Sequence, residues 1–358
     1  MSEITNHSAG RTNLRTTLLA TVCGASLFAA LCVSRPAAAA EDDADHPVVW
    51  VEVGGDFTQL NNSQELYLPP FALVTPRRSF ITQLPLYTEK NAPVSWDGYA
   101  KISFEPSSTD WVFSASIRYG RNRTNRFQEQ RTNQLTGTLG ALAFDAYQDV
   151  AAQNSESHMV LDFLAGKDVG LGRFGSGGSS VISVGVRYAQ FDSRSTVGVH
   201  YQPTNQYQPF HLFQASFTAA RKFTGIGPSL SWDASADLIG SPQEGEISLD
   251  WGLNGAVLFG RRRADIHHQT THYYEYRIRY PRYITYHTGS SPNRSKQAVV
   301  PNVGGFASVS WRLPNAKVSM GYRADIFFGA MDGGINMAKS ENRGFYGPFA
   351  SVSIGIGG

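Results

Sequence analysis

Apolar and polar residues alternate along several stretches of this chain with a period of two. Between residues 226 and 238 the even positions carry Ile, Pro, Leu, Trp or Ala, and the odd positions carry Gly, Ser or Asp. Successive side chains of a β-strand point to opposite faces, so this segment predicts a strand with one apolar face and one small or polar face. Segments 111–120, 247–259, 318–328 and 346–356 follow the same rule.

The length of these segments favours a membrane barrel. A transmembrane strand needs roughly 9–11 residues, whereas soluble strands most often have about 5–6. We therefore predict an all-β fold, a transmembrane up-and-down antiparallel β-barrel. The alternative is a secreted β-sandwich with one solvated face, whose strands would be shorter, with turn signals every 8–12 residues or so.

We predict about ten strands, joined by connections that alternate between short and long. The strands are expected near 48–57, 95–106, 109–120, 156–168, 179–191, 224–239, 246–260, 302–313, 316–328 and 343–357. The long connections, expected outside the cell, lie near 58–94, 121–155, 192–213, 261–301 and 329–342. An even strand number, short periplasmic turns and longer external loops are typical of outer-membrane barrels.

Two alternatives concern the strand count and one boundary. A hairpin of its own in the Tyr- and Arg-rich segment 270–288 would give twelve strands. An earlier start near Gln214 would extend the sixth strand past the bilayer.

The first forty residues have the features of a cleaved secretion signal. Arg11 and Arg15 precede an apolar stretch, and the alanines at 38–40 form an A-x-A-type cleavage site before Glu41. We therefore expect residues 1–40 to be removed and residues 41–358 to form the barrel in the outer membrane of a Gram-negative bacterium. Cys23 and Cys32 raise a lipoprotein alternative, but Val22 and Leu31 precede them, where lipoprotein signals carry a small residue.

Composition excludes several functional classes. Both cysteines lie in the predicted signal, so disulfides and thiol catalysis are excluded from the mature chain. The formal net charge of +2 gives no reason to expect nucleic-acid binding. After the signal no stretch approaches the ~18–20 continuous apolar residues of a spanning helix.

The polar face of each predicted strand would line the barrel interior. Fourteen charged residues fall on it, nine acidic and five basic: Glu52, Asp56, Asp97, Lys101, Glu105, Arg118, Asp162, Arg187, Asp233, Asp237, Asp250, Arg312, Arg323 and Asp325. Buried charges must be paired or hydrated. These groups therefore form either an ion-pair network that braces the strands or the walls of a water-filled path with a mild acidic excess. Because eight strands are just filled by side chains and 16–18 leave a channel, any path through about ten should be narrow.

Aromatic residues on the apolar faces of the predicted strands gather near the strand ends. They suit the girdles in which amphipathic rings sit at a membrane interface; a track for carbohydrate is the weaker alternative. The set is Phe57, Trp111, Tyr119, Tyr188, Trp251, Phe259, Trp311, Phe328 and Tyr346.

Segment 261–301 carries the remaining candidate chemistry. Its cluster His267, His268 and His272 lacks a fixed set of zinc ligands, so we expect no metal and no cofactor. Arg261–Arg263 and the Tyr/Arg-rich run 273–283 would meet lipopolysaccharide phosphates, which arginine binds with paired hydrogen bonds, or would extend the barrel wall above the bilayer.

An enzyme would need acid and base groups clustered at the external rim. Asp56 and Asp97 fall near that rim, whereas His200, His211 and His267 fall in predicted loops. Since nothing in the sequence fixes their mutual geometry, we predict that the protein is not an enzyme.

Short Gly-rich motifs in the second half of the chain resemble one known family. The motifs are 186–189 (VRYA), 223–228 (FTGIGP), 258–260 (LFG), 321–323 (GYR) and 344–349 (GFYGPF). They are similar to motifs of the Legionella-type major outer-membrane, pore-forming protein family, over residues 179–358. The resemblance implies a porin-like barrel without catalytic residues. The chain departs from many outer-membrane proteins by ending Ile356-Gly357-Gly358 rather than in the aromatic residue offered to the barrel-assembly machinery, for which Phe349 or Tyr346 would have to substitute.

These observations predict a pore-forming, porin-like barrel that passes ions or small solutes. Its expected partners are outer-membrane lipid and lipopolysaccharide, the barrel-assembly machinery and, if it conducts, the solutes themselves. The alternative is a non-conducting structural or adhesion barrel that acts through its external loops.

Overall fold

The computed structural model describes one compact unit of the chain, within Asp45–Gly358. The described residues are 48–61, 66–67, 71–75, 78–82, 85–86, 94–107, 109–123, 127–129, 133–136, 143–146, 149–169, 179–201, 210–241, 245–275, 283–333 and 339–356. The predicted signal at 1–40, with its cleavage site, lies outside them. In this part of the chain, no helix has the length and apolar character to span a bilayer.

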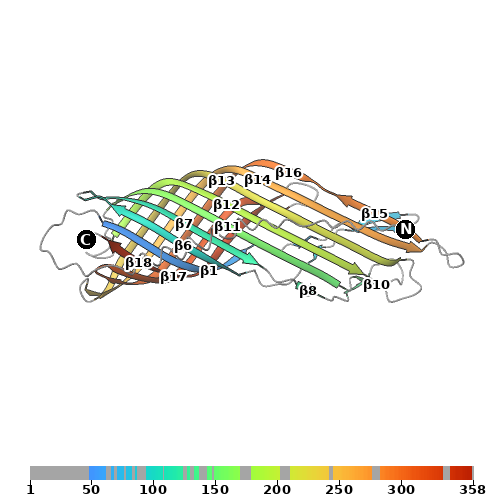
Figure 1. Ribbon diagram of the computed structural model, residues 1–358, viewed down its shortest axis with the longest axis horizontal. Helices are drawn as coiled ribbons and strands as arrows, with labels where there is room; N and C mark the ends of the chain where they lie inside the picture. The colour runs from blue at the N-terminus through green and yellow to red at the C-terminus, as the bar shows by residue number, and fades with distance from the viewer. Residues whose placement is uncertain are drawn as a thin grey trace, which may run out of the picture. The chain divides into compact units, whose positions relative to one another are not determined.

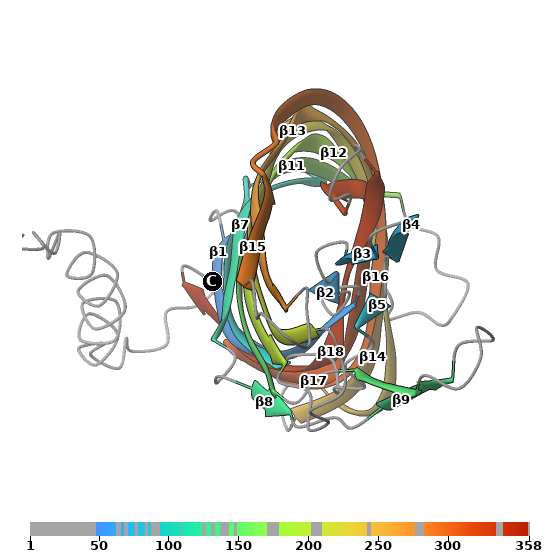
Figure 2. The same ribbon diagram turned by 90° about the vertical axis from the view of Figure 1, so that its right-hand side faces the viewer.

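Ten antiparallel strands close into an up-and-down barrel (Figures 1 and 2). In ring order they are β1 (Val48–Asn61), β6 (Val94–Glu105), β7 (Trp111–Arg123), β11 (Asp149–Asp168), β12 (Ser179–Tyr201), β13 (Phe210–Ser241), β14 (Gly245–Glu275), β16 (Asn293–Leu313), β17 (Ala316–Asp332) and β18 (Ser340–Ile356). Each strand pairs with its neighbour along the chain, and β1 pairs with β18, Val49 opposite Ile356, to complete the ring. The predicted fold class is confirmed.

Short additional strands accompany the ring. β8 (Phe127–Glu129) pairs with β11, and β15 (Tyr283–Ser290) pairs with the end of β14. The remaining ones form three separate two-stranded pairs: β2 (Leu66–Tyr67) with β5 (Pro85–Leu86), β3 (Phe71–Thr75) with β4 (Arg78–Thr82), and β9 (Asn133–Thr136) with β10 (Ala143–Ala146).

The barrel has ten strands rather than twelve because β15 adds no position to the ring. It pairs with residues 268–275 of β14, directly beyond the stretch of β14 that pairs with β16. β15 therefore continues the place of β16 in the wall, with only Ser291 and Pro292 between them.

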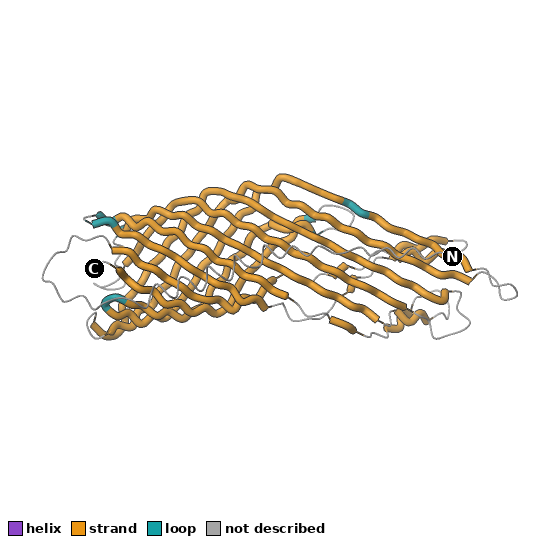
Figure 3. The backbone as a smooth tube through the Cα atoms, in the orientation of Figure 1, coloured by secondary structure: helices purple, strands orange, loops and turns teal. Residues whose placement is uncertain are grey.

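Several predicted loops are wrong, because the strands continue into them (Figure 3). Segments 192–213 and 261–301 are largely strand, in β12, β13, β14, β15 and β16, and the strand ends also extend into 58–94, 121–155 and 329–342. The sixth strand starts at Phe210, even earlier than the Gln214 alternative. Beyond the apolar band the outward residues, such as Arg194 and Lys222, are polar. The alternation that identified strands from the sequence therefore ends before the hydrogen-bonded ladder does.

The two faces of the wall differ in chemistry. Outward positions are apolar over much of each strand and exposed, as at Leu230 (56%), Leu253 (58%) and Met320 (70%). The predicted girdle members Trp111, Phe259 and Trp311 are also among the exposed side chains. Inward positions are buried and mostly small or polar, as at Ser231, Ser248 and Ser310. A closed barrel with an apolar outer face satisfies every ladder hydrogen bond internally, which a membrane-spanning structure requires.

Candidate functional site in the barrel interior

An aromatic layer crosses the interior in the half of the barrel that faces the long connections. Phe191 on β12 contacts Phe327 on β17 and Phe345 on β18, with ring centroids 4.8 and 5.3 Å away. Phe223 on β13 stacks on Phe191 at 5.8 Å. Four strands separate β12 from β18 in either direction round the ring, so these rings join opposite walls.

Smaller apolar side chains complete this layer. These side chains and the four rings come from eight of the ten strands, and all are buried. The smaller side chains are Leu60, Val160, Ala189, Ala256, Leu258, Val300, Ala330 and Met331. We call the twelve residues the aromatic layer. Packed apolar groups leave no partner for water, so this layer constricts the interior.

A buried histidine–aspartate pair adjoins the aromatic layer. The Nε2 atom of His158 lies 2.8 Å from Oδ2 of Asp97, and its ring lies 4.2 Å from that of Phe345. Asp97 also accepts hydrogen bonds from Thr58 and Ser95, both at 2.7 Å. The carboxylate is thus fully engaged inside the wall, which is what a buried charge requires.

Two arginine–aspartate pairs lie in the interior on the short-turn side of the aromatic layer. Arg118 on β7 lies 2.6 Å from Asp325 on β17, and Arg323 on β17 lies 3.1 Å from Asp56 on β1. The Arg323 guanidinium also lies 4.8 Å from the ring centroid of Tyr99. It is equally close to the ring centroid of Phe349, so it makes a cation–π contact with each ring.

Arg187 on β12 is a hub of hydrogen bonds. It donates to both carboxylate oxygens of Asp162, at 2.6 and 2.9 Å, in the bidentate geometry that gives strong charge-assisted bonds. Its third nitrogen donates to Asn254, at 2.6 Å, and to Asn302. Asn302 in turn donates to the Ile326 carbonyl at 3.1 Å. This hub links β11 to β17 across the interior.

Further pairs lie at both ends of the interior. On the short-turn side, Lys317 lies 2.6 Å from Asp250, and Arg312 lies 3.5 Å from Asp237. On the long-connection side, Arg343 lies 3.2 Å from Glu156. Charge in the interior is therefore paired at several levels along the barrel.

The fourteen predicted interior residues occupy inward-facing positions of their strands. The structure brings together Arg118 with Asp325, Arg323 with Asp56, Arg187 with Asp162, and Arg312 with Asp237. Glu52 and Lys101 lie directly opposite each other on β1 and β6. Asp97 and Asp250 instead pair with residues outside the predicted set, and Glu105 sits at the exposed end of β6. Asp233 lies on the interior face of β13.

Sequence reasoning missed the residues that complete these contacts. They are Tyr99, Glu156, His158, Asn254, Asn302, Lys317, Arg343 and Phe349, with the four rings of the aromatic layer. His158 had a detectable signal, because it lies four residues before Asp162 and therefore on the same face of the strand. The rings had none, since large apolar side chains on an inward face contradict the simple alternation.

The structure places the candidate catalytic and metal-binding residues on several strands. Asp56 and Asp97 are directly opposite each other, but His200, His211 and His267 lie in strands β12, β13 and β14 rather than in loops, which corrects the prediction. His267 contacts Asp265 at 3.2 Å and Ser291 at 2.9 Å. Among the described residues no group of three or more His, Cys, Asp or Glu side chains could hold a metal ion.

Comparison with known proteins assigns no function to this chain. No protein-family model and no curated protein matches the chain. Among solved structures, the chain is similar to a mutant of the TodX monoaromatic hydrocarbon channel, at 9% identity and a TM-score of 0.22, over 87% of this chain and 90% of that one. It is also similar to the toluene transporter TbuX of Ralstonia pickettii, at 9% identity and a TM-score of 0.14, over 87% and 89% of the chains. Likeness at this level carries no argument about function.

Proposed function

We propose that this chain is an outer-membrane barrel that passes ions or small solutes through a narrow interior. The observation that carries the proposal is the contrast between the two faces of the wall. The outer face presents exposed apolar side chains to lipid, while the inner face carries paired charges and serines from strands all round the ring. Paired charges on the inner face are compatible with a hydrated path, because charges removed from bulk water must be paired or hydrated.

The resemblance of residues 179–358 to the Legionella-type major outer-membrane family supports the same proposal. In that reading the short turns face the periplasm and the long connections face outward, as is usual for such barrels. We expect no enzymatic activity and no cofactor.

The aromatic layer would act as the constriction of this path. Its rings meet across the interior, while the charged pairs lie on both sides of it. Apolar constrictions gate pores by excluding water. The path would therefore be closed or poorly conducting while Phe191 touches Phe345, and would open when the two rings separate.

Single-channel recording in planar bilayers tests the proposal. The double variant Phe191→Ala, Phe345→Ala should give reproducible steps of larger conductance than the unsubstituted barrel. The matched control is Phe328→Ala, which removes an exposed ring from the outer face of β17 and should leave conductance unchanged. A folded double variant that shows no steps at all would overturn the proposal.

One observation favours a second candidate, the non-conducting structural or adhesion barrel. The aromatic layer and the interior ion pairs occupy the interior at successive levels, as in a braced, solid cylinder. Liposome swelling with small sugars separates the two. Swelling by the double variant alone supports a gated path, and swelling by neither protein supports the structural candidate.

A further inference from the structure

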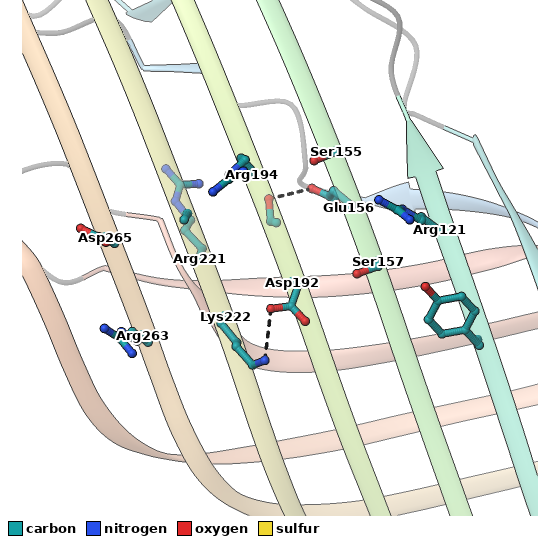
Figure 4. Close-up of a pocket in the computed structure, with 13 residues that line it drawn as sticks. Arg121, Ser155, Glu156, Ser157, Asp192, Arg194, Arg221, Lys222, Arg263 and Asp265 are labelled. Atoms are coloured by element: carbon teal, nitrogen blue, oxygen red, sulfur yellow. Dashed lines mark hydrogen bonds and ion pairs between the residues drawn. The ribbon is translucent and has the colours of Figure 1, made fainter. Parts of the chain in front are cut away.

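Directly opposed polar residues form a row on the outer face of the barrel. In order across β7, β11, β12, β13 and β14 they are Arg121, Ser157, Asp192, Lys222 and Arg263. Each is paired in register with the next, so their side chains project from one side of the wall at one level of the ladder. We call these five residues the polar row (Figure 4).

The same five strands also carry an apolar row, which lies four residues nearer the short turns than the polar row. Its members are Ile117, Leu161, Tyr188, Ile226 and Phe259, again in register. Ile117, Ile226 and Phe259 are exposed on the outer face, as expected for side chains that meet lipid acyl chains. The row between the two is mixed, from Tyr119 on β7 to Arg261 on β14. The wall thus passes from acyl-chain contact to cationic surface within a few residues.

A pocket of about 590 Å³ lies at the polar row. The outward-facing cationic side chains that line it are Arg121, Arg194, Lys222 and Arg263 (Figure 4). Two carboxylates line the pocket on the same face. Asp192 lies 3.5 Å from the Lys222 ammonium, and Asp265 lies 3.2 Å from the His267 ring. Among the described residues, no ion pair involves Arg121, Arg194 or Arg263. The pocket therefore presents several guanidinium groups to an anion from outside.

We propose that this surface binds the phosphorylated headgroup of a lipid A-type glycolipid, with the acyl chains lying against the apolar row. The inference rests on the proposed outer-membrane location. Guanidinium groups bind phosphate through paired, charge-assisted hydrogen bonds. A free phosphate would need only the cations, whereas the apolar row four residues away on the same face fits a ligand that carries both phosphate and hydrocarbon.

The test measures lipid binding to barrel that is refolded from urea into detergent and therefore carries no native lipid. Native mass spectrometry of the barrel titrated with bisphosphorylated lipid A gives the fraction of barrel with lipid bound. The triple variant Arg121→Gln, Arg194→Gln, Arg263→Gln should bind at least roughly tenfold more weakly, since each charge-assisted bond contributes appreciably. The triple Arg→Lys variant keeps the charge and should bind at an intermediate level.

Three controls identify the ligand and the site. Lys167→Gln removes an exposed cation from the short-turn end of β11 and should leave lipid binding unchanged. Fully dephosphorylated lipid A should bind about as weakly to the intact barrel as the phosphorylated lipid binds to the triple Gln variant. Inorganic pyrophosphate in excess should compete only poorly.

Three results would overturn the proposal. They are equal binding by the intact barrel and the folded triple Gln variant, equal binding of phosphorylated and dephosphorylated lipid, or complete displacement by pyrophosphate, which would assign the pocket to a free anion. The lipid readout does not require conduction. A barrel that binds lipid but never conducts refutes the pore alone, and one that conducts without phosphate-dependent binding refutes this site alone.

Discussion

Phe191 and Phe345 touch across the barrel, with ring centroids 5.3 Å apart, although four strands separate β12 from β18 in either direction round the ring. Both side chains are almost completely buried, at 1% and 3% exposed. Interior contacts of this kind join opposite walls that the ladder alone would not hold at a fixed separation. The pair therefore affects both the stability of the barrel and the proposed passage of solutes through it.

Replacing Phe191 with Ala should lower the free energy of unfolding by roughly 3–5 kcal/mol, as is typical for a large buried ring that leaves a cavity. Phe328→Ala on the lipid-facing side of β17 is the matched control and should cost much less in detergent. Urea unfolding of both variants, followed by tryptophan fluorescence, gives the comparison. Equal losses would mean that the aromatic layer contributes no packing energy.

Replacing Arg187 with Met should also destabilise the barrel by roughly 3–5 kcal/mol, because it leaves the largely buried Asp162 carboxylate, 14% exposed, without its cation. The double variant Arg187→Met, Asp162→Leu removes both charges and should recover part of the loss. The midpoint of urea unfolding measures each variant. A double variant as unstable as the single one would contradict an ion pair at this position.

Gly120 on β7 faces the Asp97–His158 pair so closely that a Cβ there would overlap the Asp97 carboxylate and the His158 ring. Gly120→Ala should therefore cost roughly 1–3 kcal/mol, the usual range for overpacking. Gly98→Ala on β6 is the control, because no atom lies within 4 Å of the Cβ it would add. Thermal unfolding on heat-modifiability gels should shift for Gly120→Ala only.

Neutralising one member of a cross-interior pair should change ion selectivity. In the Phe191→Ala, Phe345→Ala background, Arg118→Gln leaves Asp325 uncompensated and should favour cations, whereas Asp325→Asn leaves Arg118 and should favour anions. Reversal potentials in a salt gradient should shift in opposite directions. Arg263→Gln on the outer face should produce no shift, and unchanged potentials in all three would show that the pair does not line the path.

Much of the architecture follows from alternation. The apolar positions of residues 226–238 predicted the outer face of β13. The predicted break between strands 302–313 and 316–328 is the turn at Pro314-Asn315 that joins β16 to β17. The strand ends on the long-connection side were not predicted, because outward residues such as Arg194 and Lys222 are polar beyond the lipid band. Only the ladder, in which Asp192 lies opposite Lys222 and Lys222 opposite Arg263, shows that the wall continues there.

The sequence by itself determined which side chains point inward and which point outward, because a strand alternates its faces whatever its neighbours are. It could therefore place Arg118, Arg187 and Asp325 on the interior face. Only the tertiary structure decided their partners. Contacts such as Arg118 with Asp325, or Phe191 with Phe345, depend on the tilt of the strands and the register at which β18 meets β1, and these arise only when the ring closes.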